Sequence, residues 1–319
     1  MIDINKYGAS IFAGGISFLN NTHKRIFTRV RHPFSLFNIE LTNKCPMKCI
    51  MCARTYAMTR PLGFMNVSLF EDIIDQLCSM QGYRRQEILW LHHFGESLLH
   101  PQFDYCIKYA EERGLTTGLS VNPLLFNDDI SGKLLLSGLS CLYASLDGYD
   151  NETFELIRGL PNSFDRSSNN LKLFAEQKYK TASKMKLIVS IIDLRMNMKN
   201  LTSRMEYWKT VKGIDNVIIK QFTRWSGDNS EINRLDPKIA QRSKSNEQIC
   251  CFNPWRHMSV CWDGVVVPCC YDCNKAVVLG NVNTSSLQTI WNDKPIRRLR
   301  SEFASGRVIN PLCRNCPEL

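Results

Sequence analysis

The stretch Cys45-Pro-Met-Lys-Cys49-Ile-Met-Cys52 decides how this sequence is interpreted. It has the spacing Cys-x3-Cys-x2-Cys, and it follows an alternating, strand-like run from Ser35 to Leu41. Iron–sulfur clusters are usually held by four cysteines, so three thiolates leave one iron of a cubane cluster without a protein ligand. An open coordination position distinguishes a catalytic metal site from a closed structural one. The alternative, a zinc knuckle, needs a second Cys/His pair nearby, and none lies within 25 residues downstream.

The motif and its position after a first strand resemble the radical S-adenosylmethionine (SAM) superfamily. The resemblance implies that Cys45, Cys49 and Cys52 hold a [4Fe–4S] cluster whose fourth iron binds the amino and carboxylate groups of SAM. It also implies that SAM is cleaved to a 5′-deoxyadenosyl radical. Met51 stands where an aromatic residue is often found, but a thioether can still pack on the adenine ring. We therefore expect Met51 to contact the cofactor.

The composition is that of a globular protein with a basic surface. Of the 319 residues, 44% are hydrophobic and 22% are charged, and the formal net charge is +10. A basic surface suits nucleic acid, an anionic membrane, a phosphorylated substrate or an acidic electron donor. No RNA-binding motif or dense Lys/Arg block is present, so nucleic acid is not expected. The fourteen cysteines fall in clusters with ligand spacing, which favours bound clusters in a reducing cytoplasm over disulfides.

The first 36 residues form an extension ahead of the first strand. The run from Gly8 to Leu19 is mildly apolar, but its twelve residues are too few to span a bilayer. Positive charge follows this run instead of preceding it, unlike a signal peptide. We expect a helix packed on the outside of the main domain. An interfacial, membrane-touching helix is the alternative, and membrane contact is not the expectation.

Strand-like and helix-like stretches alternate from about residue 37 to residue 245, which predicts an α/β domain. The expected strands are 37–42, 87–94, 117–122, 141–147, 186–192 and 216–221. Helical patterns include Ser68–Met80, Gln102–Arg113 and Leu201–Val211. The resemblance implies a partial, TIM-like (β/α)6 barrel, in which functional groups gather at the C-terminal ends of the strands. We expect an extension over 1–36, the barrel domain over 37–245 and a small domain over 246–319.

The second expected strand ends in His92-His93-Phe94-Gly95-Glu96. This resembles the Gly-Gly-Glu segment that binds the SAM ammonium group in the superfamily, with Phe94 in place of the first glycine. Glu96 is then the expected acceptor, and Gly95 permits close approach of the backbone. His92 and His93 point to opposite faces because side chains alternate along a strand. One of them faces the barrel interior, as a structural histidine or as a substrate contact.

Polar residues also follow the third, fourth and fifth strands. The resemblance places them around SAM or the substrate: Asn122, Ser145, Asp147, Ser190 and Arg195. Arg195 is the expected partner of the SAM carboxylate, since a guanidinium binds a carboxylate through two parallel hydrogen bonds. The stretch that contains Arg158 is expected over the barrel mouth. Each residue has an alternative interpretation as an ordinary polar residue at a strand end.

The C-terminal 70 or so residues contain a second set of cysteines: Cys251, Cys269, Cys313 and Cys316. Asp263-Gly264 predicts a hairpin turn, and Thr284–Phe303 predicts a helix. The arrangement resembles the SPASM/Twitch extension of radical SAM enzymes in its short form. The resemblance implies one auxiliary [4Fe–4S] cluster on these four cysteines, with Cys270 as an alternative to Cys269. A zinc ribbon is the competing interpretation.

The remaining cysteines fall into two groups. Cys78, Cys106 and Cys141 are expected to be small buried apolar residues in the barrel. Near the auxiliary site lie the candidates for giving a hydrogen atom to a substrate radical: Cys250, Cys261, Cys270 and Cys273.

The short C-terminal extension resembles that of enzymes which modify sugars and aminocyclitols. It implies hydrogen abstraction from a carbohydrate-like or aminocyclitol metabolite, followed by dehydrogenation or epimerisation. The implied partners are a small-molecule substrate and a flavodoxin- or ferredoxin-type electron donor. An anionic or a carrier-linked substrate is also compatible with the resemblance. One alternative is a maturase of ribosomally synthesised peptides, although the N-terminal extension is short for a peptide-binding domain. A non-catalytic iron–sulfur or zinc scaffold is another.

Overall fold

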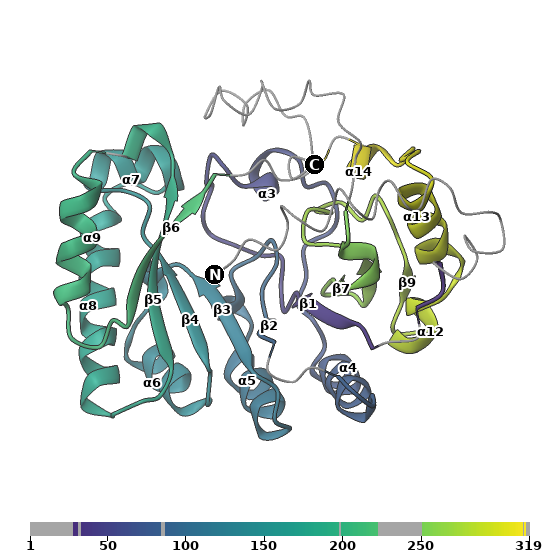
Figure 1. The fold of residues 1–319 in the computed structure, drawn as a ribbon. Coiled ribbons are helices and arrows are strands. Elements are labelled where there is room, and N and C mark those ends of the chain that lie inside the picture. Colours follow the sequence, from purple (N-terminus) through teal and green to yellow (C-terminus); the bar gives the residue numbers. More distant parts are fainter. Residues whose placement is uncertain are drawn as a thin grey trace.

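A computed structural model describes residues 28–30, 33–83, 87–197, 199–222, 251–314 and 316, with the side chain of Arg195 left out. Within these residues the chain forms one mixed sheet with helices on its outer face (Figure 1). The predicted linker at about 228–248 lies outside the described residues, so the domain boundaries stay a prediction. No helix in the described part of the chain combines the length and the apolar character needed to cross a bilayer.

Six parallel strands form the larger part of the sheet, in the order β6-β5-β4-β3-β2-β1. They are β1 (Ser35–Ile39), β2 (Leu89–Trp90), β3 (Thr117–Val121), β4 (Cys141–Ser145), β5 (Lys186–Asp193) and β6 (Asn216–Gln221). All six lie within or beside the stretches predicted from the sequence, although β2 is much shorter. The described strands do not close into a complete barrel, because β6 and β9 (Gly280–Asn281) form the two edges.

The two faces of the parallel strands differ in chemistry. Leu119, Leu142 and Leu187 are aligned in register on one face, and each is fully buried. That face is covered by helices (Figure 1), which include α5 (Phe103–Glu112), α6 (Asp128–Leu136), α8 (Phe164–Lys180) and α9 (Leu201–Thr210). Ser120 and Tyr143 are aligned on the opposite, inner face and are only half-buried. The inner face therefore has the side chains that a ligand can reach.

The helices form where the sequence combines a cap with an apolar stripe. In α4 (Val67–Ser79), the side chain of Asn66 accepts a hydrogen bond from the Ser68 N–H at 2.9 Å. Phe70, Ile73 and Leu77 of this helix are fully buried, at the spacing of one helix face. The predicted helices 68–80, 102–113 and 201–211 are confirmed by α4, α5 and α9 to within two residues.

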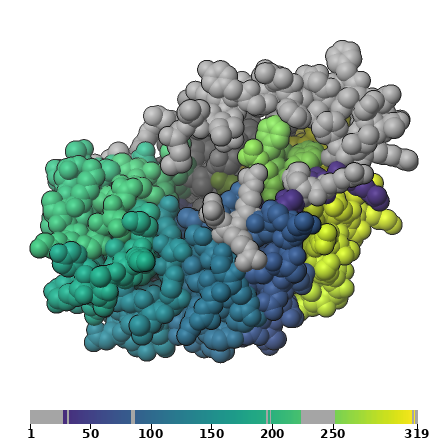
Figure 2. Space-filling view, turned by 60° about the horizontal axis from the view of Figure 1, so that its bottom comes forward, coloured from purple at the N-terminus to yellow at the C-terminus, as the bar shows by residue number. Residues whose placement is uncertain are grey.

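The C-terminal part continues the same sheet. β7 (His257–Val260) pairs in parallel with β1, and β8 (Val265–Val267) returns antiparallel to β7 through the turn at Gly264. Gly264 has φ +84°, a left-handed conformation that favours glycine. The predicted hairpin is confirmed. Figure 2 shows the C-terminal helices beside the segment that carries α4, where the Leu287 N–H donates to Gln76 Oε1 at 2.8 Å.

The prediction of one helix over Thr284–Phe303 is wrong. The structure has two helices, α12 (Leu287–Trp291) and α13 (Lys294–Ala304), separated at Asn292 and Asp293. Pro295 explains the break: it lacks an N–H and clashes with a preceding turn, so it fits only at the start of a helix.

Gly213 provides a test of the packing around β6. Its φ is +93°, and a Cβ atom there would lie 1.9 Å from the carbonyl oxygen of Ala175 in α8. We expect Gly213→Ala to destabilise the fold by about 1–3 kcal/mol or more, because it adds left-handed backbone strain to the clash. The measurement is the midpoint of thermal or chemical unfolding.

Gly132→Ala in α6 is the matched control. A Cβ atom at Gly132 would have nothing within 4 Å, so helix propensity favours the alanine by up to about 1 kcal/mol. An unfolding midpoint of Gly213→Ala equal to that of the wild type would contradict the described turn.

Candidate active site

The cysteine motif lies in a loop between β1 and the short helix α3 (Ala53–Tyr56). Cys49 is buried, whereas Cys45 and Cys52 are half-buried. The Cys52 N–H donates to the Cys49 carbonyl at 3.1 Å, which makes a compact turn at the end of the motif. All three thiols are free, and they come from one short loop at the C-terminal end of the first strand.

The end of α7 (Asn151–Arg158) holds this loop in place. The Lys48 N–H donates to the carbonyl of Arg158 at 3.1 Å, and the Ile50 N–H donates to the carbonyl of Ile157 at 3.0 Å. The last carbonyls of a helix have no partner within the helix, so the loop satisfies groups that would otherwise need water. The stretch around Arg158 therefore lies against the cysteine loop.

The donor set fits an iron–sulfur cluster better than a single zinc ion. Around tetrahedral zinc with Zn–S bonds near 2.3 Å, sulfur atoms lie about 3.8 Å apart. Within the described residues, the only three ligand atoms that all lie within 4.8 Å of one another belong to Glu40, His93 and Cys261, not to the motif. Burial raises the pKa of Cys45 to about 12 and that of Cys52 to about 11. Both thiols therefore need a bound cation in order to ionise at neutral pH.

Arg158 places a positive charge beside the same loop. Its Nη1 lies 3.5 Å from Cys49 Sγ, and its Nη2 forms an ion pair with the buried carboxylate of Asp147. The other oxygen of Asp147 accepts a hydrogen bond from the Ile192 N–H at 2.7 Å. Asp147 thus orients Arg158 toward the cysteine loop. Its predicted role in binding SAM or substrate stays a prediction.

Glu96 is an acceptor fixed by backbone groups. Its side chain accepts hydrogen bonds from the Asn122 N–H at 2.9 Å and from the Leu98 N–H at 3.3 Å, and the residue is 4% exposed. Burial raises the pKa of this carboxyl to about 7. Nearby, the Nδ2 atom of Asn122 is buried and has no hydrogen-bond partner among the residues that the structure describes. An acceptor and an unused donor at the same strand ends fit the ammonium and carboxylate groups of an amino acid.

Gly95 allows the loop after β2 to contact the segment that leads into the cysteine motif. A Cβ atom at this position would lie 2.0 Å from the carbonyl oxygen of Thr42, just before the cysteine motif. The following Glu96 N–H donates to the Lys44 carbonyl at 2.8 Å. A glycine permits this close approach of the backbone, whereas its predicted contact with SAM stays a prediction. Met51 is buried at 3% exposure inside the cysteine loop.

A row of hydroxyl groups crosses the inner face of the sheet. The Oγ atom of Ser145 lies 3.4 Å from that of Ser120 and 3.4 Å from that of Ser190. His92 lies beside this row, and its Nδ1 accepts a hydrogen bond from the Ser120 N–H at 3.2 Å. Burial lowers the pKa of His92 to about 3, so its ring is neutral and Nε2 is the nitrogen that carries hydrogen. The side chain of Arg195 lies outside the described residues.

The second set of cysteines converges although its members are far apart in sequence. The thiols of Cys251 and Cys313 are close enough to Cys269 to act on its pKa, which burial raises well above the ordinary value. Cys313 in turn lies near Cys251 and Cys316. All four are half-buried, as Cys270 is too. This set fits a four-cysteine cluster, with both Cys269 and Cys270 within reach.

The predicted hydrogen donors differ in exposure. Cys261 is completely buried, and Cys273 is 1% exposed and packs against Ala53 and Phe94, beside the end of the cysteine motif. Cys270 is half-buried. Cys250 lies outside the described residues.

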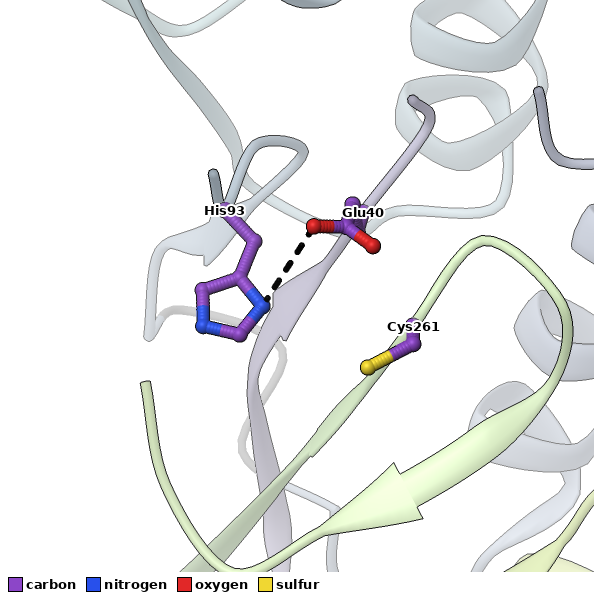
Figure 3. A group of neighbouring side chains, drawn as sticks. All are labelled: Glu40, His93 and Cys261. Carbon is purple, nitrogen blue, oxygen red and sulfur yellow. Dashed lines mark ion pairs between the residues drawn. The ribbon is translucent and has the colours of Figure 1, made fainter. Parts of the chain in front are cut away.

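The sequence did not reveal a buried ion-pair cluster that joins the two cysteine sites. Glu40 follows β1, and its carboxylate is bound by the guanidinium of Arg60, with Nη1 at 2.6 Å from Oε2. Figure 3 shows Glu40 with His93 and Cys261, and His93 Nδ1 lies 3.7 Å from Glu40 Oε1. His93 Nε2 lies 2.7 Å from the carbonyl of Cys270. The only hint of this cluster in the sequence was the acidic residue Glu40 between the apolar residues Ile39 and Leu41.

This cluster is an ion pair and not a metal site. Each oxygen of Glu40 binds one nitrogen of Arg60 and one backbone N–H, from Phe94 or from Trp262 at 3.3 Å each, so its acceptor positions are used. Burial acts to raise the pKa of Glu40, but the hydrogen bonds from Arg60 and the nearby His93 hold it below its ordinary value. The Nε of Arg60 also donates to the Cys273 carbonyl at 2.6 Å. We call Glu40, Arg60 and His93 the Glu40 ion-pair cluster.

Comparison with known families identifies the two regions. Residues 39–193 match the profile of the radical SAM superfamily, and residues 250–317 match that of an iron–sulfur cluster-binding domain, SPASM. The chain therefore contains a radical SAM domain followed by an iron–sulfur cluster-binding SPASM domain. Its cofactors are accordingly SAM, a [4Fe–4S] cluster and an auxiliary iron–sulfur cluster, and these predictions are confirmed.

Two curated proteins resemble this radical SAM chain along most of its length. The tungsten-containing aldehyde ferredoxin oxidoreductase cofactor-modifying protein of Pyrococcus furiosus is 22% identical, over 87% of this chain and 86% of its own. The S-adenosyl-L-methionine-dependent 2-deoxy-scyllo-inosamine dehydrogenase of Niallia circulans is 22% identical, over 89% of this chain and 92% of its own. The predicted similarity to aminocyclitol-modifying members is confirmed.

A solved structure shares the fold. BtrN, crystallised in complex with AdoMet and 2-DOIA, superposes with a TM-score of 0.57 at 17% identity, covering 89% of this chain and 93% of BtrN. At this identity the likeness shows the fold alone. The predicted α/β architecture with a C-terminal hairpin and helical segment is confirmed, and the assignment of individual residues stays a prediction.

The contribution of the Glu40 ion-pair cluster to the stability of the protein can be tested. Removing one partner leaves the other charge buried and unpaired, which costs about 3–5 kcal/mol, whereas removing both costs less. We expect Glu40→Leu and Arg60→Leu each to lower the thermal midpoint of the anaerobically reconstituted protein more than the double variant does.

Lys133→Leu serves as the control, because the Lys133–Asp129 pair is exposed. Its removal is expected to leave the thermal midpoint unchanged within error. Additive losses in the double variant would show that Glu40 and Arg60 act independently.

Proposed function

We propose that this chain is a radical SAM oxidoreductase that abstracts a hydrogen atom from a carbohydrate-like or aminocyclitol small molecule and dehydrogenates it. The observation that carries the proposal is its similarity, along 89% of its length, to a dehydrogenase of 2-deoxy-scyllo-inosamine. The hydroxyl row of Ser120, Ser145 and Ser190 on the half-buried inner face supports it, since hydroxyl groups can both donate to and accept from a polyol.

Each cofactor has its proposed ligands. Cys45, Cys49 and Cys52 hold the SAM-binding cluster, and the auxiliary cluster is held by Cys251, Cys269, Cys313 and Cys316. When bound, SAM and the clusters supply a 5′-deoxyadenosyl radical and an acceptor for the electron that dehydrogenation releases. A flavodoxin- or ferredoxin-type donor in the cytoplasm completes the proposal, and the net charge of +10 favours such an acidic partner.

The residues of the chain act by orienting what binds. Glu96 is the proposed acceptor for the SAM ammonium group, because two backbone N–H groups already fix its carboxylate. The unused Nδ2 of Asn122 is the nearby donor for the cofactor. Ser145 and Ser190 bind hydroxyl groups of the cofactor ribose or of the substrate.

The first test removes the ligands of the SAM-binding cluster together. We expect Cys45→Ala/Cys49→Ala/Cys52→Ala to keep the visible absorbance of the auxiliary cluster and to form no 5′-deoxyadenosine from SAM and a reductant. Iron per chain and 5′-deoxyadenosine are the measurements. Cys106→Ala, in the buried core of α5, is the matched control and is expected to keep both.

Formation of 5′-deoxyadenosine by the triple variant would refute the assignment of the motif. Failure of the wild type to form it with any sugar, cyclitol or peptide substrate would refute the enzymatic proposal. Activity with a peptide alone would favour the maturase alternative.

The second test separates dehydrogenation from epimerisation. Epimerisation needs a thiol in contact with the substrate radical, and Cys270 is the half-buried candidate, whereas Cys261 and Cys273 are buried. For a dehydrogenase we expect Cys270→Ala, Cys261→Ala and Cys273→Ala all to form the oxidised product, two hydrogens lighter by mass spectrometry. A product of unchanged mass and inverted stereochemistry, lost only in Cys270→Ala, would favour epimerisation.

A further inference from the structure

Lys220 brings a positive charge onto the inner face of the sheet. It lies near the C-terminal end of β6, where it pairs in register with Ile192 of β5. Its side chain extends back across the sheet, so that Nζ lies 4.4 Å from the centre of the Tyr143 ring in β4. The ammonium group is therefore directed toward the middle of the half-buried face and not outward to bulk water.

This charge has no anionic partner among the residues that the structure describes. No described carboxylate lies within 4 Å of Lys220 Nζ, and no described atom accepts a hydrogen bond from it. Two other buried or half-buried cations, on the helices α7 and α8, are paired: Arg158 with Asp147, and Lys178 with Asp215. Placing an unpaired cation in a partly desolvated site is unfavourable unless something binds it.

The ammonium group is available at neutral pH. Burial lowers the pKa of Lys220 to about 8, Asp147 acting in the opposite direction. Most of the population is still protonated at pH 7, and an anion bound at Nζ would stabilise the charged form further.

Two aromatic rings lie beside this charge and meet edge to face. The ring centres of Trp90 and Tyr143 lie 5.0 Å apart. Trp90 fits against the sheet because its neighbour in β3 is Gly118, where a Cβ atom would lie 2.7 Å from the indole ring. Trp90 and Tyr143 are both half-buried, and the hydroxyl row begins at Ser120, which is aligned with Tyr143. Charge, aromatic surface and hydroxyl groups thus lie side by side on one face.

We infer that Lys220 binds an anionic group, a carboxylate or a phosphate, on a hydroxylated substrate whose carbon skeleton packs against Tyr143 and Trp90. The inference rests on the proposed function and narrows its substrate class. A substrate with an ammonium group at this position would be repelled, so the preferred compound differs in charge from an aminocyclitol. An ammonium group and an aromatic surface next to hydroxyl groups are the usual means of orienting such a molecule.

The test compares one carbon skeleton with four different charges. Glucose, glucosamine, glucuronate and glucose 6-phosphate, with myo-inositol and its 1-phosphate as a second skeleton, are titrated into the reconstituted, SAM-bound protein by calorimetry. We expect at least one anionic compound to bind about tenfold or more tightly than its neutral counterpart, as for one charge-assisted hydrogen bond. Glucuronate and the phosphates distinguish the two anionic groups. In Lys220→Met this preference is lost, and in Lys220→Arg it is retained.

Lys212→Met is the matched control, because Lys212 lies over the ring of Tyr179 at 5.7 Å but is exposed on the outside. It is expected to keep the preference. Equal binding of neutral and anionic compounds by the wild type, or an unchanged preference in Lys220→Met, would overturn the inference. The inference would also be overturned if Lys220→Met lost as much affinity for SAM as for the anionic compound, because Lys220 would then bind the cofactor. Formation of 5′-deoxyadenosine by the wild type is measured in parallel, and its absence would count against the proposed function instead.

Discussion

The cysteine loop is held in place by hydrogen bonds to another part of the chain, the end of α7. Two of its backbone N–H groups donate to the carbonyls of Ile157 and Arg158 at the end of α7, and Arg158 then turns back onto Cys49. The last carbonyls of a helix have no partner within the helix, and the irregular loop that carries the three thiols has backbone N–H groups that need acceptors. The geometry of the loop is therefore fixed by a helix that follows it by about a hundred residues.

The same principle joins the two cysteine sites. Glu40 lies at the end of β1, Arg60 follows α3, and the carbonyls of Cys270 and Cys273 come from the C-terminal part. The side chains of Glu40, Arg60 and His93 are buried and therefore need partners, and these partners lie in different segments. A displacement of the C-terminal part would deprive Arg60 Nε and His93 Nε2 of their acceptors, the carbonyls of Cys273 and Cys270. The Glu40 ion-pair cluster thus holds the C-terminal segment with Cys270 and Cys273 against the end of β1.

Much of the fold follows from the sequence because its signals are local. The strands from Thr117, Cys141 and Lys186 alternate clearly or are continuously apolar, and the cysteine spacing is contained in eight residues. The break between α12 and α13 depends on one proline, which a long amphipathic pattern concealed. The ion pair of Glu40 and Arg60 was not predictable, because its partners are 20 residues apart and its backbone donors include Trp262. Contacts between residues that are far apart in the sequence produce no periodic pattern in it.

The position of Lys220 shows why substrate specificity was beyond the sequence. β6 reads Asn-Val-Ile-Ile-Lys-Gln, which does not alternate, so the pattern alone does not tell which face each residue occupies. Only the register with β5 and the contact with Tyr143 place the ammonium group on the inner face. The outer face is limited to apolar side chains by the helices that cover it, whereas the inner face is limited only by what it must bind. A change of one inner residue can therefore change the charge of the preferred substrate while the packing that maintains the fold stays the same.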